Sequence, residues 1–155
     1  MTHSLVTPSL DIRKVPDSRR LACLPKHFPN AYLAVETHIF DMMSRISESY
    51  CGGYWEFYEI ANGGFYMIPE GPAQMEIVVP FGNGFSECVS KEVAGIAATM
   101  LGLSFAMQLA HDQTVPLMPG YDLRADGNRL YDHFTNLRHL IGSHPDGSTI
   151  LRAID

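Results

Sequence analysis

Residues 54–68, YWEFYEIANGGFYMI, contain the pattern that decides the fold. The runs 54–60 and 65–68 are rich in aromatic and β-branched residues, which suit the pleated surface of a strand. Between them, Ala61-Asn62-Gly63-Gly64 offers the positive φ angles that a tight turn requires. The stretch therefore predicts an antiparallel β-hairpin.

A third strand is expected soon after this hairpin. Pro69, Gly71 and Pro72 predict a turn, and residues 74–79, QMEIVV, then alternate polar and apolar side chains up to Pro80. Alternate residues of a strand point to opposite faces, so this segment would have one apolar face. We expect the three strands to form a small antiparallel three-stranded sheet with meander topology.

Four segments carry apolar residues at helical spacing. They are residues 31–47 with Asn30 as the N-cap, residues from 91 to about 110 with Ser90 as the N-cap, residues 128–141, and a short segment from Pro145 to Ile154. Residues 111–127 predict a connection with at most one short turn of helix, because they contain Pro116, Pro119 and Gly120. The expected fold class is α+β, a small sheet packed with about four helices.

The second of these helices is apolar almost all round, which predicts the central, most buried helix. Its uncharged run, Val93 to Ala110, approaches the length that spans a membrane. It contains Gly95, Gly102 and Gln108, however, and is rich in alanine. A buried core helix is therefore favoured, and no membrane association is expected.

The length of 155 residues allows one ordinary domain. Residues 1–18 lack periodicity and predict a flexible N-terminal tail, and residues 19–155 predict a single domain. The three cysteines are widely spaced and odd in number, which favours neither a disulfide framework nor a paired metal clip. With no apolar signal segment at residues 1–10, we expect the protein in the cytoplasm.

The formal net charge of −6 conceals a segregation along the chain, because residues 46–123 hold nine acidic residues against Lys91 alone. Strong direct binding to DNA is disfavoured, since affinity for phosphates comes from clustered Lys and Arg. Imitation of DNA is also disfavoured. A mimic about 35 Å across would need on the order of 20 negative charges on one side. The 17 acidic residues of this chain, diluted by 11 basic ones, do not reach that density.

The sequence gives little support to catalysis or to a metal site. It contains no Cys-x-x-Cys and no His-Glu-x-x-His, and His133 and His139 are too far apart on a helix to share a face. No catalytic residue, cofactor or metal ligand is therefore predicted. The alternative function is an enzyme or a domain that binds a small molecule or a metal, using Cys51 and the Gly82–Gly84 loop. Turn chemistry is the simpler interpretation of that loop.

The density of aromatic residues in the hairpin has two interpretations. The simpler is core packing with cross-strand aromatic pairs. The functional one is a face that binds a partner, because Tyr and Trp are favoured anchors of interfaces. Glu56 and Glu59 differ by three positions, so they point to opposite faces and cannot form a carboxylate pair. The candidate partner-binding residues are Tyr54, Trp55, Glu56, Tyr58, Glu59, Asn62 and Tyr66.

Residues 52–59, GGYWEFYE, followed by NGGFYM at 62–67 and then Pro69, resemble the ArdB/KlcA family of antirestriction proteins. The similarity continues through Ala94-Gly95-Ile96 to the closing Ala153-Ile154-Asp155 and so covers residues 19–155. The resemblance implies a small α+β protein of plasmids and other mobile elements that relieves restriction by type I restriction–modification enzymes. The family is distinct from the antirestriction proteins that imitate DNA.

The resemblance carries no established catalytic residues to this chain. Our hypothesis is a noncatalytic mechanism, in which the outward residues of the hairpin bind a protein component of the type I restriction machinery or an associated host factor. Exposed aromatic side chains would also suit a homodimer contact. The target and the face of the hairpin that points outward stay open at this stage.

Overall fold

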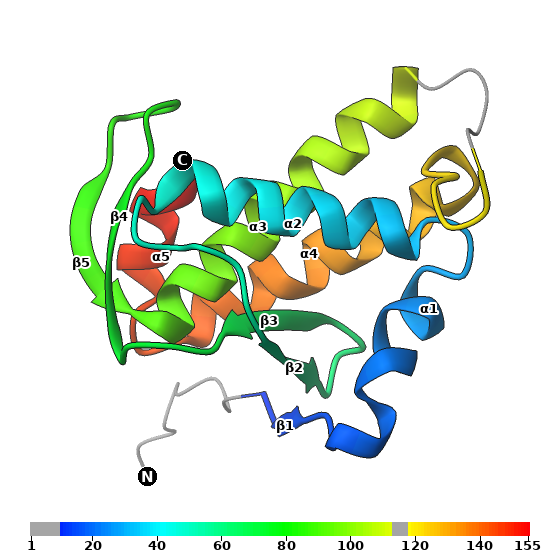
Figure 1. The fold of residues 1–155 in the computed structure, drawn as a ribbon, viewed down its shortest axis with the longest axis horizontal. Coiled ribbons are helices and arrows are strands. Elements are labelled where there is room, and N and C mark those ends of the chain that lie inside the picture. The colour runs from blue at the N-terminus through cyan, green and yellow to red at the C-terminus, as the bar shows by residue number, and fades with distance from the viewer. Residues whose placement is uncertain (1–9, 113–117) are drawn as a thin grey trace, which may run out of the picture.

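The computed structural model describes residues 10–112 and 118–155 and confirms the α+β class (Figure 1). Two small antiparallel sheets accompany the helices. The strands are β1 (Ile12–Lys14), β2 (Trp55–Ile60), β3 (Phe65–Pro69), β4 (Gln74–Val78) and β5 (Ser86–Ser90). The α-helices are α1 (Cys23–His27), α2 (Tyr32–Ile46), α3 (Lys91–Asp112), α4 (Gly127–Ser143) and α5 (Gly147–Ile154). Two 3-10 helices, η1 (Asp17–Ala22) and η2 (Arg124–Asp126), complete the described elements.

The predicted hairpin is confirmed as β2 and β3, which pair antiparallel with Tyr58 opposite Tyr66. In the turn, Gly63 has a φ of 93°. The backbone N–H of Gly64 donates to Oδ1 of Asn62 at 2.9 Å, so the asparagine side chain helps to close the turn. This local chemistry fixes the register of the two strands.

The predicted meander is wrong in its third strand. Residues 74–78 do form a strand, β4, but β4 pairs with β5 in a separate two-stranded sheet. The three-stranded sheet has the order β1-β2-β3, so its third member comes from the N-terminal segment. The outer edge of β3 was not free for β4, because α3 lies against it.

The expected tail over residues 1–18 is also wrong for residues 12–18. Strand β1 pairs with β2, with Arg13 opposite Glu59, and η1 follows it. The backbone N–H of Val15 donates to the carbonyl of Phe57 at 2.8 Å, and Val15 is buried. These contacts join segments far apart in the sequence, so hydrophobic periodicity did not reveal them.

Helix α3 is the centre of the molecule, in contact with α2, α4, α5 and β3 (Figure 1). Its predicted N-cap is confirmed, because the N–H of Val93 donates to Oγ of Ser90 at 3.1 Å. By length and composition α3 could cross a membrane, but 67% of its most apolar 18-residue window is buried inside the protein. That burial accounts for its apolar surface, as the sequence predicted.

Two glycines let α3 approach its neighbours closely. A Cβ built on Gly95 would overlap the carbonyl oxygen of Met67 and come within 2.9 Å of Cα of Ile68. One built on Gly102 would come within 2.9 Å of Cα of Ile39 on α2. A side chain at either position would push α3 away from β3 or α2.

Helix α2 begins as expected, but its predicted N-cap is wrong. No side chain of residue 30 or 31 caps α2; the carboxylate of Asp126 accepts the backbone N–H groups of Asn30 and Ala31, each at 2.8 Å. Asp126 is fully buried and also pairs with Arg129 at 3.1 Å. The predicted connection over residues 111–127 supplies this carboxylate from η2, while its residues 113–117 lie outside the described residues.

Replacing Gly95 with alanine should destabilise the fold, because the new methyl group meets backbone atoms of β3 that cannot yield. Overpacking of this kind costs about 1–3 kcal/mol in the free energy of unfolding. Gly142 on α4 is the matched control, since nothing lies within 4 Å of a Cβ built there. Gly142→Ala should stabilise the protein by up to about 1 kcal/mol. Urea denaturation of both variants tests this, and equal effects would contradict the close packing at Gly95.

Candidate functional site

The structure separates the predicted partner-binding residues into buried and accessible members. Trp55 and Tyr66 are each only 1% exposed, so neither offers the accessible side chain that the predicted partner-binding role requires. The ring of Trp55 packs on Phe40 and Tyr50, and its Nε1 donates to the Tyr50 hydroxyl at 2.9 Å. The simpler interpretation, core packing, therefore holds for these two residues. The sequence could not show this, because η1, α1 and α2 cover the face that Trp55 occupies.

Tyr54, immediately before β2, is the most exposed of the predicted residues at 38%. The guanidinium group of Arg20 lies 3.7 Å from the centre of its ring, and its hydroxyl donates to Oδ1 of Asp17 at 3.2 Å. Arg20 in turn donates from Nε to the carbonyl of Trp55 at 3.0 Å. Asp17 and Arg20, both in η1, thus fix the orientation of Tyr54.

A groove with a volume of about 230 Å³ lies between η1 and α1 on one side and α2 on the other. Leu21 stands at its border and is 85% exposed, the largest exposure among the large apolar side chains of the described residues. Burial raises the pKa of Glu36, and the charge of Arg20 partly opposes this shift. We call this feature the Leu21 groove; its other lining residues are Leu24, Pro25, Tyr32, Leu33, Phe40, Gly53, Trp55 and Phe57.

The other face of the hairpin holds stacked tyrosines. The rings of Tyr58 and Tyr66 are 5.3 Å apart and nearly parallel, and the hydroxyl of Tyr66 donates to Oε1 of Glu92 at 2.9 Å. Burial, together with the charge of Glu92, strongly raises the pKa of Tyr66. Glu56 forms an ion pair with Lys14 at 3.4 Å. Tyr58 and Glu56 are half-buried, so this face offers only part of the surface that we expected.

Asn62 and Glu59 are also half-buried, and each is engaged within the protein. The side-chain amide of Asn62 donates to the carbonyl of Asn136 on α4 at 2.9 Å. Glu59 points to the face opposite Glu56, as the spacing predicted. Its Oε2 lies 2.9 Å from Nζ of Lys26 and 2.6 Å from Nε2 of His27.

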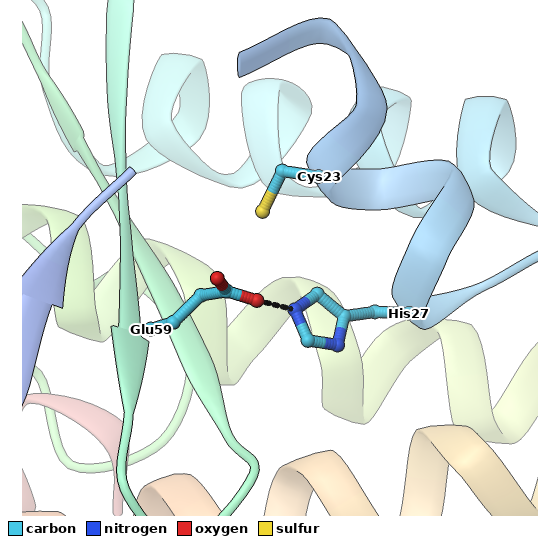
Figure 2. Close-up of side chains that lie close together, drawn as sticks. All are labelled: Cys23, His27 and Glu59. Atoms are coloured by element: carbon cyan, nitrogen blue, oxygen red, sulfur yellow. Dashed lines mark hydrogen bonds and ion pairs between the residues drawn. The ribbon is translucent and has the colours of Figure 1, made fainter. Parts of the chain in front are cut away.

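Cys23, His27 and Glu59 converge between α1 and β2 (Figure 2). Each residue offers one potential metal-ligating atom, and these three atoms lie within 4.8 Å of one another. Burial raises the pKa of Cys23 to about 12, so the thiol is protonated at neutral pH. Burial also lowers the pKa of His27, although the hydrogen bond to Glu59 opposes this. For Glu59 burial alone would raise the pKa, but the hydrogen bonds from Lys26 and His27 outweigh it and lower the pKa.

His133 of α4 lies directly against this cluster. Its ring meets that of His27 edge-on, with the centres 4.7 Å apart, and it also contacts Phe28 and Phe65. Burial lowers the pKa of His133 to about 4. Its Nδ1 is buried and has no hydrogen-bond partner among the described residues. A neutral imidazole therefore packs against His27, one of the three potential metal ligands.

Sequence reasoning missed this cluster, although a signal was present. Cys23 and His27 are four residues apart, which places both side chains on one face of a helix. Neither Cys-x-x-Cys nor His-Glu-x-x-His contains a cysteine and a histidine at this spacing. Glu59 comes from a strand more than thirty positions away, and nothing in its own pattern indicated its partners.

The residues of the alternative function, Cys51 and the Gly82–Gly84 loop, do not belong to the cluster of Cys23, His27 and Glu59. Cys51 is exposed, and no hydrogen bond from its thiol is found within residues 10–112 and 118–155. Gly82 and Gly84 each have a φ of 76°, as expected for a turn. Asn83 between them donates to the carbonyl of Arg152 at 3.0 Å, so the loop rests on α5. This geometry gives the loop a structural role.

Comparison with known proteins identifies the family. A family model described as "Antirestriction protein" matches residues 48–155. The chain belongs to the antirestriction protein family. Antirestriction protein KlcA of Escherichia coli is 34% identical over 158 residues, with 100% of both chains covered. A second KlcA from Escherichia coli is 36% identical over 151 residues, covering 97% of this chain and 95% of its own.

The antirestriction fold itself is also matched by a solved structure, from work on the KlcA and ArdB proteins. It superposes with a TM-score of 0.78 at 33% identity and covers 99% of this chain and 100% of its own. The KlcA and ArdB proteins show a novel fold and antirestriction activity against type I DNA restriction systems in vivo but not in vitro. The resemblance seen in the hairpin motif is thereby confirmed.

The burial of the hairpin in this antirestriction protein leads to a stability prediction. Trp55→Ala should lower the free energy of unfolding by about 3–5 kcal/mol, because it removes a large buried ring. Tyr54→Ala should lower it by about 1 kcal/mol or less, since its ion–ring and hydroxyl contacts are near the surface. Urea denaturation measures both. Losses of equal size would show that Tyr54 is part of the core or that Trp55 is not.

Proposed function

We propose that this protein relieves restriction of incoming DNA by type I restriction–modification systems. The observation that carries this proposal is the family membership, supported by relatives aligned over almost the whole chain at 34–36% identity. The TM-score of 0.78 to a structure from work on KlcA and ArdB extends the similarity to the fold. The surface on which activity depends is therefore expected in the same framework of helices and hairpin.

We further propose that the mechanism is noncatalytic and works through contact with another protein. KlcA and ArdB act in vivo but not in vitro, which suits a target or a host factor that is present only in the cell. The buried thiol of Cys23 is a poor nucleophile, because its raised pKa keeps it protonated. The net charge of −6 is too small for imitation of DNA and has the wrong sign for tight binding to it.

The Leu21 groove, together with Tyr54, is the surface that best fits a protein contact. Leu21 is an apolar side chain held almost wholly in solvent on an ordered helical turn. Beside it, an aromatic groove is flanked by a cation, Arg20, and a carboxyl group, Glu36. An apolar anchor with aromatic and charged neighbours is typical of the residues that dominate binding energy. Glu56 and Tyr58 lie on the opposite face of the hairpin, and Glu59 and Asn62 bind within the protein, so among the predicted residues Tyr54 is the one we assign to this surface.

Phage plating on a host with an active type I system tests the function. Cells that express the protein should plate unmodified phage more efficiently than cells with an empty vector. On a host without the restriction system the two should be equal, because relief acts only through restriction. Equal plating on both hosts, with the protein shown to accumulate, would contradict the proposed function.

The surface assignment is tested with the double variant Leu21→Asp/Tyr54→Ala. Loss of an interface anchor costs about 2 kcal/mol or more, so relief of restriction should fall by roughly tenfold or more. The matched control is Tyr131→Asp on α4, because Tyr131 is 61% exposed and does not line the groove. The double variant should unfold at a urea concentration only slightly below that of the unaltered protein, because the loss of the Tyr54 contacts costs about 1 kcal/mol or less. Full relief by the double variant, or an equal loss in the control, would contradict the assignment of the contact to the Leu21 groove and Tyr54.

A further inference from the structure

We propose that Cys23, His27 and Glu59 form a binding site for one divalent transition-metal ion, with zinc as the best match. The three side chains come from two elements, α1 and β2, and point toward one another (Figure 2). One potential ligand atom from each side chain lies within 4.8 Å of those of the other two. This inference goes beyond the antirestriction function, because it assigns a ligand to a cluster that the function does not require.

The donor set favours zinc over harder cations. Cys23 would release its proton to solvent as it binds the ion. The resulting thiolate, an imidazole and a carboxylate are common ligands of Zn²⁺, whereas Mg²⁺ and Ca²⁺ take oxygen ligands. Around tetrahedral Zn²⁺, neighbouring ligand atoms are separated by roughly 3.4–3.6 Å. Atoms already within 4.8 Å would reach these separations by small side-chain movements. Three protein ligands leave a fourth position for water or another donor.

The backbone presents two of the three ligands together. Cys23 and His27 are four positions apart on α1, so one helical turn places the sulfur and the ring on the same side. Glu59 completes the set from β2, which β1 and β3 hold on both sides. The cluster is therefore supported by ordered secondary structure on each side, as a metal site requires.

The surroundings suit a partly enclosed site. Cys23 is 3% exposed. The side chain of Glu59 is 28% exposed and offers a path for the ion. Lys26 opposes a cation, but its side chain is 63% exposed, so it can turn into solvent. The ring of His133 meets that of His27 edge-on and covers the cluster from the side of α4.

The competing explanation is a metal-free core contact, in which His27 and Lys26 simply neutralise Glu59. It accounts for the hydrogen bonds of Glu59 but assigns no role to the thiol of Cys23, which faces the same space (Figure 2). The two explanations differ in one observable property. Only the metal site predicts a bond between a cation and the sulfur of Cys23.

Cobalt substitution in the full chain carrying Cys51→Ser and Cys88→Ser tests the proposal. In this background Cys23 is the only thiol, because the chain has three cysteines. Titration of the reduced protein with Co²⁺ should produce a thiolate-to-cobalt charge-transfer band and tetrahedral ligand-field bands that saturate at one equivalent. Zn²⁺ should then displace the cobalt and abolish the bands. Absence of the charge-transfer band would overturn the proposal. Because this background leaves Cys23, His27 and Glu59 unaltered, such a result could not be attributed to a damaged site.

Ligand variants in the same background assign the other two residues. His27→Gln and Glu59→Gln should each weaken binding of Zn²⁺ by about tenfold or more, measured by competition with a chelating dye. The matched control His139→Gln, an exposed histidine of α4, should leave affinity unchanged. Circular dichroism confirms that the variants fold. Equal affinity in all of them would overturn the assignment of ligands. Phage plating plays no part, so the metal site and the antirestriction function can fail separately.

Discussion

The structure depends on how α3 closes the edge of the hairpin. Strand β3 is the outer strand of its sheet, and its backbone would otherwise be left unpaired in the core. The hydroxyl of Thr99 accepts from the N–H of Met67 at 3.2 Å and donates to the carbonyl of Gly95 at 2.7 Å. Gly95 lacks a side chain at the point where the helix meets Met67. Thr99 binds the backbone at this edge, and Gly95 lets the helix come close to it. The apolar helix α3 therefore covers the edge of β3 in place of a further strand.

The N-terminal segment determines what remains accessible on the hairpin. Strand β1 covers the free edge of β2, while Arg20 and His27 reach its residues from η1 and α1. Of the aromatic residues in the hairpin region, Tyr54 is the most exposed at 38%, and even its ring is held by Arg20. The accessible surface therefore lies where two distant parts of the chain meet, which is why the candidate contact includes Leu21 as well as Tyr54.

The sequence predicted those features that depend on neighbouring residues. The hairpin turn at Asn62, the cap at Ser90 and the helical faces follow from local chemistry, and all are confirmed. The sequence did not predict the features that depend on residues far apart in the chain. The contact of Asp126 with the backbone just before α2, the pairing of β4 with β5, and the burial of Trp55 each depend on a partner in another element. Alternation along a strand says which residues share a face, but not which face another element will cover.

The candidate metal ligands also come from distant parts of the chain, α1 and β2, so the sequence did not predict that they meet. Their position next to η1 links them to the Leu21 groove. Cys23 immediately follows η1, whose Arg20 and Leu21 line the groove. The contacts of His27 and Lys26 with Glu59 hold α1 against β2, so they also set where η1 lies. An ion bound by Cys23, His27 and Glu59 would replace a partly exposed ion pair with stronger bonds between the same two elements. Position and stability of the Leu21 groove would then depend on that ion, although no residue of the groove touches it.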